Sequence, residues 1–313
     1  MDGNPVKAVF DPGQTFDAHR RSVLVGLVRT ARVKQWSKNV LVFAAPGAAG
    51  VLTHSHSLLR SLGAFAAFCA VSAGTYFIND ALDAEADRRH PTKQERPVAA
   101  GTVTRPLAMM TGAALMAGGI AAGAALSWRL ALVVAVYVVA QFSYSLYLKH
   151  QPVLDLVTVA AGFVLRAIAG AVTVPVRVSE WFLIVATFGS LLMVTGKRVA
   201  EHAELGETRG THRATLDAYT STFLRTVLAI SAGGAIVGYC LWAFSLQTAL
   251  THHHDPIWYQ LSIVPMMIAL LRYTFLVEGG QGAKPEELLF ADRPLQALGV
   301  VWATLFTLGV YIS

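Results

Sequence analysis

The chain has 313 residues, of which 54% are hydrophobic and only 14% are charged. Soluble domains carry about 25% charged residues, so the composition excludes a disordered chain, a fibrous protein and an ordinary cytosolic enzyme, and favours a protein that uses lipid as its solvent. The net charge of +6 does not indicate nucleic-acid binding, because membrane proteins concentrate Lys and Arg in cytoplasmic loops. Cys69 and Cys240 lie within apolar runs, and we expect small core residues rather than a disulfide or a metal pair.

The apolar residues gather into segments long enough to cross a bilayer, for which about 20 mostly apolar residues are needed. Residues 1–28 are predicted to be a polar tail without a cleavable signal peptide, and residues 29–313 to be a single transmembrane domain. Pro46 interrupts the first of the predicted spans. The sequence predicts an all-α integral membrane protein with nine transmembrane helices, at about 39–53, 58–79, 106–127, 130–148, 153–174, 181–196, 226–249, 257–277 and 295–312.

Basic residues are distributed unequally between the two sides of these spans. Lys and Arg are frequent before the first span and after the second, sixth and eighth, whereas the opposite side has only Arg60, Arg129 and Arg177. Because cytoplasmic loops carry the excess of Lys and Arg, we expect the N-terminus inside, the C-terminus outside and the chemistry on the cytoplasmic face. The GxxxG pair of Gly119 and Gly123 is compatible with a homo-oligomer.

The most informative segment continues the second span into the cytoplasm and reads NDALDAEADRRH from Asn79. If the helix persists, Asp80, Asp83 and Asp87 lie on one face, with Asn79 beside Asp83, whereas Glu85 points away. Three carboxylates in a row destabilise a helix unless a cation neutralises them, and Mg²⁺ binds carboxylate and phosphate oxygens. We therefore predict a Mg²⁺ site here. The alternative is a charged helix end that stops the span at the interface.

A loop bounded by Pro91 and Pro97 follows this segment and contains Lys93 and Arg96. Proline restricts the backbone of the loop at both ends. A diphosphate requires cations next to a carboxylate–Mg²⁺ cluster, because the metal bridges two of its oxygens and Lys and Arg neutralise the others. The loop therefore predicts a diphosphate site.

These motifs resemble the UbiA prenyltransferase superfamily, whose first Asp-rich motif reads N-D-x-x-D-x-x-x-D. Within that superfamily the chain is similar to the decaprenyl-phosphate phosphoribosyltransferase branch over about residues 29–313. The similarity rests on four further segments: VKQWSKN (33–39), HPTKQERPVAAG (90–101), GFVLRAIAG (162–170) and KRxxE (197–201).

The resemblance implies a bundle of nine transmembrane helices around a central cavity that is open to the cytoplasmic side. It implies Mg²⁺-dependent transfer of 5-phosphoribose from phosphoribosyl diphosphate (PRPP) to decaprenyl phosphate, for arabinan synthesis in the bacterial cell envelope. The catalytic residues would be Asp80, Asp83 and Asp87. The expected partners are the two substrates and the lipid of the plasma membrane, with no nucleic acid.

The inner end of the sixth span departs from the superfamily pattern. Most members have a second Asp-rich motif on a later helix, whereas this chain has Lys197 and Arg198 there, with Glu201 and Glu204 as the acids. Extra cations suit a pair of substrates with many phosphate groups, so we predict that Lys197 and Arg198 bind PRPP. The alternative is that they anchor the helix at the inner interface.

Two residues inside or near the spans are also predicted to bind PRPP. Arg166 lies within the fifth span, where an unpaired charge is costly; the alternative is a structural ion pair, for example with Asp155. Tyr147 lies near the inner end of the fourth span, as does Tyr144, where aromatic residues also form interfacial belts.

The lipid phosphate is expected near the first span. Lys34, Gln35, Lys38 and Asn39 precede that span on a segment that also contains Trp36. We predict that they bind the lipid phosphate; the alternative is a basic anchor attracted to anionic lipid. The tract HHHD at 252–255 has a metal-binding composition, but it lies in a predicted outer turn, and we expect a solvated loop.

The predicted reaction is attack by a phosphate oxygen of the lipid on C1 of the ribose. Because the acceptor is already an anion, catalysis depends on positioning and electrostatics. Two alternatives remain open. A prenyltransferase acting on an aromatic acceptor would need a second acidic cluster, and a transporter would place charges near the midplane of broken, repeated helices.

Overall fold

The structure is a computed structural model that describes residues 12–205, 214–249, 257–281, 288 and 291–311. The regular structure in these ranges is helical throughout, with no β-strand, which confirms the all-α prediction. Chain contacts divide the protein into two compact units. The first contains Met1–Ser37 and Cys69–Gly119, and the second contains Lys38–Phe68 and Ile120–Ser313.

The first unit contains α1 (Pro12–Ala31), the second part of α3 (Ser55–Leu82), α4 (Ala84–Arg89), η3 (Lys93–Glu95) and most of α5 (Arg105–Leu126). Helix α1 covers much of the segment predicted to be a polar tail. Glycines let α3 and α5 pack closely, because a Cβ atom at Gly74 would lie only 2.7 Å from the carbonyl oxygen of Gly112. The core of this unit consists of Phe77, Ala81, Ala84, Val98, Val103 and Ala108.

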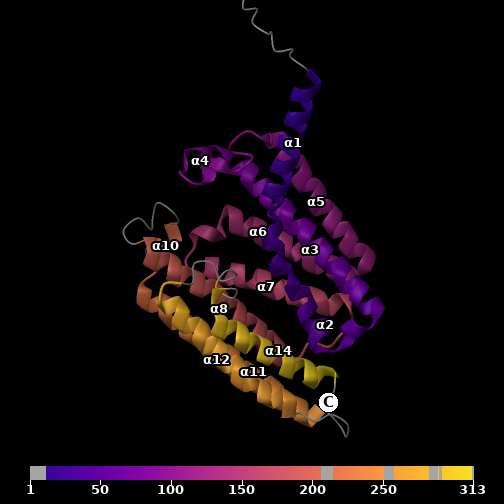
Figure 1. The fold of residues 1–313 in the computed structure, drawn as a ribbon, viewed down its shortest axis with the longest axis vertical. Coiled ribbons are helices and arrows are strands. Elements are labelled where there is room, and N and C mark those ends of the chain that lie inside the picture. Colours follow the sequence, from indigo (N-terminus) through magenta and orange to yellow (C-terminus); the bar gives the residue numbers. More distant parts are fainter. Residues whose placement is uncertain (1–11, 206–213, 250–256, 282–287, 289–290, 312–313) are drawn as a thin grey trace, which may run out of the picture. The chain divides into compact units, whose positions relative to one another are not determined.

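The second unit is a bundle of long helices joined by short ones (Figure 1). Helix α7 (Leu154–Thr173) packs against α6 (Trp128–Leu146) and α8 (Glu180–Leu205). Helix α11 (Ser221–Ala249) packs against both α8 and α12 (Ile257–Glu278), and α12 packs against α14 (Arg293–Tyr311). In the chain, the short helix η4 (Leu148–His150) lies between α6 and α7, and the short helix α10 (Ala214–Ala218) lies between α8 and α11.

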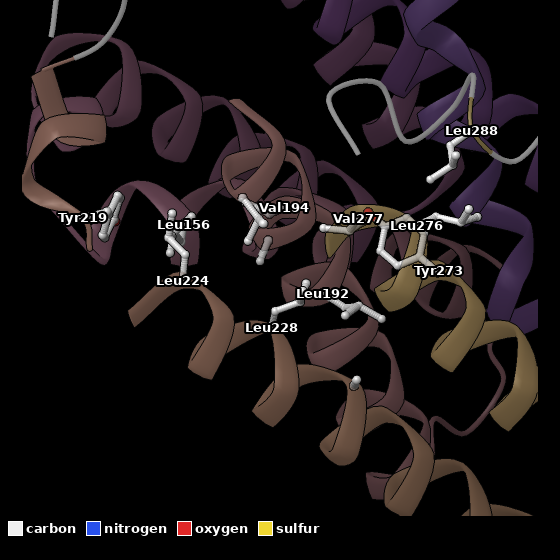
Figure 2. Packing of buried hydrophobic residues seen from close by; sticks show 13 residues of the cluster. Leu156, Leu192, Val194, Tyr219, Leu224, Leu228, Tyr273, Leu276, Val277 and Leu288 are labelled. Atoms are coloured by element: carbon white, nitrogen blue, oxygen red, sulfur yellow. The ribbon is translucent and has the colours of Figure 1, made fainter. Parts of the chain in front are cut away.

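Buried side chains of α7, α8, α11 and α12 form an apolar cluster in the second unit (Figure 2). Leu156, Leu192 and Leu228 are each at most 2% exposed. A second cluster is aromatic and includes Tyr239, Trp242 and Tyr259. Burial of this apolar surface contributes about 25 cal/mol per Å² only where water is the reference, so inside a bilayer close packing and interhelical hydrogen bonds are the larger contributors.

Eight described helices are long and apolar enough to span a membrane: α3, α5, α6, α7, α8, α11, α12 and α14. The first predicted span, 39–53, is instead a series of short pieces: η1 (Val33–Phe43), α2 (Ala44–Ala48) and η2 (Val51–Thr53). Pro46 cannot donate a backbone hydrogen bond, and Gly50 has a left-handed φ of +69°, so no continuous helix forms there. Cys69 is buried and Cys240 is half-buried, and the two thiols are not joined in a disulfide.

Candidate functional site

The Asp-rich segment is helical but is interrupted once. Helix α3 ends at Leu82, Asp83 forms a bend, and α4 begins at Ala84. The bend is small, because Asp83 keeps helical dihedral angles of −85° and 0°. Its N–H donates to the carbonyl of Asn79 at 2.9 Å, and the N–H of Asp87 donates to the carbonyl of Asp83 at 2.8 Å. The near-helical course keeps Asp80 and Asp87 on one side.

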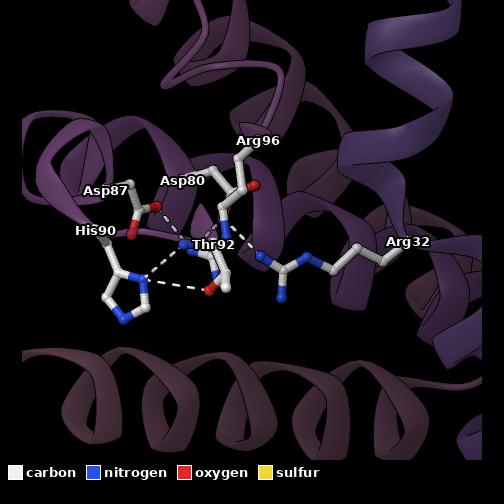
Figure 3. A network of polar contacts seen from close by, with 6 residues as sticks. All are labelled: Arg32, Asp80, Asp87, His90, Thr92 and Arg96. Atoms are coloured by element: carbon white, nitrogen blue, oxygen red, sulfur yellow. Dashed lines mark hydrogen bonds and ion pairs between the residues drawn. The ribbon is translucent and has the colours of Figure 1, made fainter. Parts of the chain in front are cut away.

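Two arginines neutralise these two carboxylates (Figure 3). Nη1 of Arg96 lies 2.7 Å from Oδ2 of Asp87 and 3.3 Å from Oδ1 of Asp80. Nη2 of Arg32 donates to the same Oδ1 of Asp80 at 2.7 Å. Asp80 and Asp87 are only 2% and 4% exposed. Arg96 therefore links the two buried acids of the motif, as the predicted proximity of this loop to the acidic helix requires.

The structure separates the third aspartate from the other two. Asp83 is exposed, whereas Asp80 and Asp87 are buried. Within the described ranges no group of three His, Cys, Asp or Glu side chains is close enough to hold a metal ion. The donor chemistry still fits Mg²⁺, because Asp80, Asp87, Asp83 and the amide of Asn79 offer only oxygen ligands of the kind it prefers. The metal role of these residues stays a prediction.

The loop after the motif is held by backbone and side-chain contacts. Nε of Arg88 donates to the carbonyl of Ala99 at 3.0 Å, and Thr92 contacts Nδ1 of His90 at 3.3 Å. Lys93 lies on η3 and is half-buried. Glu85 points away from the acidic pair, as expected, and is paired with Arg105 at 3.3 Å. The loop thus places Arg96 against Asp80 and Asp87. Lys93 is close to these aspartates in the sequence.

Arg166 is the centre of a polar cluster inside the second unit. It is 7% exposed, and its Nε donates to Oδ1 of Asn39 at 2.7 Å. Its Nη1 donates to the carbonyl of Gly162 at 2.6 Å, and its Nη2 donates to the hydroxyl of Tyr137 at 2.9 Å. The guanidinium also lies 4.7 Å from the centre of the Tyr137 ring, a favourable cation–π distance. Asn39, predicted to bind lipid phosphate, and Arg166, predicted to bind PRPP, are therefore in direct contact.

The structure joins Asp155, the alternative ion-pair partner for Arg166, to Arg198. Oδ2 of Asp155 lies 3.5 Å from Nε of Arg198, and Nη1 of Arg198 donates to Oε2 of Glu201 at 2.7 Å. The hydroxyl of Tyr219 donates to Oδ1 of Asp155. Burial and this hydrogen bond raise the pKa of Tyr219 above its usual value of 10, because both favour the neutral phenol.

The other predicted residues are accessible. The side chain of Lys197 is 46% exposed, and its Nζ lies 3.8 Å from Oε1 of Glu201. Tyr147 follows the end of α6 and is exposed. Lys34 is exposed, whereas Gln35 and Lys38 are half-buried, all on η1. The side chain of Glu204 and the tract at 252–255 lie outside the described residues.

Three residues of these clusters were not predicted from the sequence: Arg32, Tyr137 and Tyr219. Arg32 is one of the basic residues that precede the first predicted span. Its contact with Asp80 joins positions 48 residues apart, and Arg32 has a left-handed φ of 50° in the turn that ends α1. The motif VKQWSKN begins immediately after Arg32, which is the one local signal that could have drawn attention to it.

Comparison with known proteins agrees with this architecture. The sequence pattern described as "UbiA prenyltransferase family" matches residues 40–292. The decaprenyl-phosphate phosphoribosyltransferase of Corynebacterium glutamicum is 41% identical over 92% of this chain and 87% of that protein. The protein of the same name from Mycolicibacterium smegmatis is 41% identical over 94% of this chain and 95% of its own length.

Solved structures of the same fold are more distant in sequence. A UbiA homologue from Archaeoglobus fulgidus bound to DMAPP and Mg²⁺ has a TM-score of 0.69 at 18% identity, with 90% of this chain and 97% of that chain covered. A digeranylgeranylglyceryl phosphate synthase structure has a TM-score of 0.65 at 15% identity, over 93% and 99% of the two chains. At such identities the likeness shows the fold alone.

The long apolar helices and this fold define a multi-pass membrane protein with an acidic motif at the end of one span. The chain belongs to the UbiA prenyltransferase family, which its match over residues 40–292 and its relatives at about 40% identity show.

Proposed function

We propose that the protein transfers 5-phosphoribose from PRPP to decaprenyl phosphate and releases diphosphate. The observation that carries the proposal is 41% identity over 92–94% of the chain to two decaprenyl-phosphate phosphoribosyltransferases. The reaction would supply a lipid-linked precursor of arabinan in the cell envelope. The cytoplasmic face of the plasma membrane is the proposed location, with the N-terminus inside and the C-terminus outside.

The buried acidic pair is the proposed centre for the donor. Asp80 and Asp87, together with Asp83 and Asn79, would hold Mg²⁺, which neutralises part of the charge of the diphosphate when it is bound. Arg96 already faces both buried acids, so its guanidinium is oriented by the chain before substrate arrives. Lys93 is proposed to neutralise a further phosphate oxygen.

The chemistry requires one bond exchange at C1 of the ribose. The bond from C1 to the diphosphate oxygen breaks, and a bond from C1 to a phosphate oxygen of the lipid forms on the opposite face, which inverts the anomeric centre. The acceptor oxygen is already negative, so no proton has to be removed. The protein's contribution is to position the two substrates and to stabilise the leaving diphosphate.

The remaining cations are assigned to the two substrates. Lys197 and Arg166, with Tyr147, are proposed to bind PRPP, whereas Lys34, Gln35, Lys38 and Asn39 are proposed to bind the lipid phosphate. The contact between Arg166 and Asn39 makes these two assignments dependent on one another, because a change in either side chain alters the hydrogen bonding of the other.

Prenyl transfer to an aromatic acceptor is the second candidate reaction, and the inner end of α8 argues against it. A second acidic cluster would be needed to bind a prenyl diphosphate through several metal ions. Here Glu201 is paired with Arg198 at 2.7 Å and with Lys197 at 3.8 Å, so its charge is neutralised by cations of its own helix.

Purified protein in detergent, supplied with Mg²⁺ and labelled substrates, tests the proposal. We expect label from PRPP to enter decaprenyl phosphate, and no transfer of a prenyl group from prenyl diphosphate to an aromatic acid. The reverse result would replace the proposed function with prenyl transfer. Uptake of substrate into proteoliposomes without any covalent product would indicate a transporter.

A further inference from the structure

The polar cluster around Asp155 lies where α7 begins and α8 approaches its inner end. The Asp155 carboxylate is fully buried, and the chain itself contacts both of its oxygens. Oδ1 accepts a hydrogen bond from Tyr219. Oδ2 lies 3.5 Å from Nε of Arg198 and accepts from the hydroxyl of Thr215 at 3.5 Å. A buried carboxylate held on both sides is suited to fix the position of its partners.

Arg198 has a second carboxylate on its other side. Its Nη1 donates to Oε2 of Glu201 at 2.7 Å, and its side chain is only 4% exposed. The positive charge therefore lies between two negative ones, Asp155 and Glu201. A phosphate bound to Arg198 would be repelled by both carboxylates. It would also have to displace Arg198 from a buried ion pair, and breaking such a pair is energetically costly. This geometry suits a structural role better than contact with substrate.

Tyr219 extends the same cluster to the segment before α11. The N–H of Val153 donates to the Tyr219 hydroxyl at 2.6 Å. The carbonyl oxygen of Tyr219 lies 3.1 Å from Nε2 of His202 on α8. These contacts join the start of α7, the end of α8 and the start of α11 around one buried acid.

Lys197, next in the chain to Arg198, is in a different environment. Its side chain is 46% exposed, and its Nζ is 3.8 Å from Oε1 of Glu201. An exposed pair at this distance contributes little stability, so the ammonium can exchange Glu201 for a phosphate oxygen at little cost.

We propose that Arg198 is a positioning residue, which together with Asp155 and Tyr219 fixes the inner end of α8 so that Lys197 is presented to the phosphate groups of PRPP. The inference rests on the proposed function. It moves Arg198 from the substrate-binding residues, where the KRxxE motif placed it, to the residues that orient Lys197.

A double-variant cycle tests this division of roles. Arg198→Met leaves Asp155 buried without its cation and should raise the KM for PRPP, and Asp155→Asn should do the same by leaving Arg198 with one partner. The variant with both changes should recover most of the loss, because the two charges disappear together. Coupling between contacting residues corresponds to about 2- to 150-fold. If the double variant keeps the full KM defect of Arg198→Met, Arg198 contacts the donor and the proposal is wrong.

Two further variants keep the test independent of folding defects. Tyr219→Phe retains every charge and should raise the KM for PRPP with little change in kcat, because only the orientation of the cluster is loosened. An unchanged KM in this variant contradicts the proposal. Arg225→Met is the matched control, since Arg225 pairs with Glu278 at 2.9 Å with its side chain 61% exposed, and its KM should equal that of the wild type.

A measurement without turnover separates this inference from the proposed function. Lys197→Cys, in a chain whose own two cysteines are replaced, can be labelled with a water-soluble maleimide. Adding Arg198→Met should change the labelling rate, and adding Asp155→Asn as well should restore it. Restoration in a protein that does not transfer phosphoribose would leave the positioning role standing and remove the proposed reaction. A rate unaffected by Arg198→Met would overturn the positioning role.

Discussion

Replacing Arg96 with Gln is the sharpest perturbation of the acidic site. The change removes the cation that lies 2.7 Å from Asp87 and 3.3 Å from Asp80. Asp80 still has its ion pair with Arg32 at 2.7 Å. Asp87 loses its ion pair with Arg96, and the described residues provide no second one. Removing one partner of a buried pair costs about 3–5 kcal/mol. Because the Arg96 side chain is 29% exposed, we expect the lower end, about 3 kcal/mol.

The expected loss can be measured as a shift of the thermal unfolding midpoint in detergent. For a large chain 1 kcal/mol corresponds to about 2 °C, so Arg96→Gln should lower the midpoint by about 6 °C at neutral pH. The matched control is Arg105→Gln, which removes a pair with the exposed Glu85 at 3.3 Å and a hydrogen bond from Nε to the carbonyl of Ala81 at 3.1 Å, and should cost about 1–2 kcal/mol.

A compensating change identifies the cause of the loss. Asp87→Asn added to Arg96→Gln removes the unpaired charge and should restore part of the midpoint without restoring activity, because Arg96 is also proposed to bind diphosphate. If Arg96→Gln and Arg105→Gln shift the midpoint equally, Arg96 does not neutralise buried carboxylates in the folded protein, and the account of the acidic site is wrong.

Three other predictions concern the metal, the substrates and pH. Asp83→Asn should abolish turnover with little change in the unfolding midpoint, because Asp83 is exposed; near-normal activity at saturating Mg²⁺ would remove it from the metal site. Lys34→Ala should raise the KM for decaprenyl phosphate and Lys197→Ala that for PRPP, each by about 10- to 150-fold; separate titrations check this, and two variants that weaken the same substrate would contradict the assignment. The hydrogen bond from Arg272 lowers the pKa of Asp292 below 3.8. The ionised Asp292 therefore stabilises the fold above pH 3.8, and this stabilisation is lost as the pH falls through the folded pKa. The difference in unfolding midpoint between wild type and Asp292→Asn should disappear in acid, and a difference that grows in acid would contradict the prediction.

The spans could be predicted from the sequence because each depends on local composition. About 20 apolar residues form a helix in lipid whatever their neighbours are, since every backbone group must be satisfied within the segment. The segment at 39–53 shows where this reasoning fails. Its composition is apolar, but Pro46 and Gly50 prevent the continuous hydrogen bonding that a span requires.

The site could be predicted only where the chemistry is local in the sequence. Asp80, Asp87 and Arg96 lie within 17 consecutive positions, and helical spacing with a short loop is enough to bring them together. Asp83 follows the same spacing but is exposed, which the spacing alone does not determine. The contact between Arg32 and Asp80 depends on how α1 packs against α3, which no pattern within either segment determines.

Charge type alone also could not separate the two neighbours in the KRxxE motif. Lys197 and Arg198 are adjacent cations, yet a turn of 100° per residue points one toward solvent and the other between Asp155 and Glu201. Arg is the residue that suits a position between two carboxylates, because its planar guanidinium donates in several directions at once. Lys has a compact charge on a flexible stem and suits an exposed position from which it can move to a phosphate. The order Lys-Arg is therefore expected to matter, and exchanging the two residues should impair the protein although its charge and composition are unchanged.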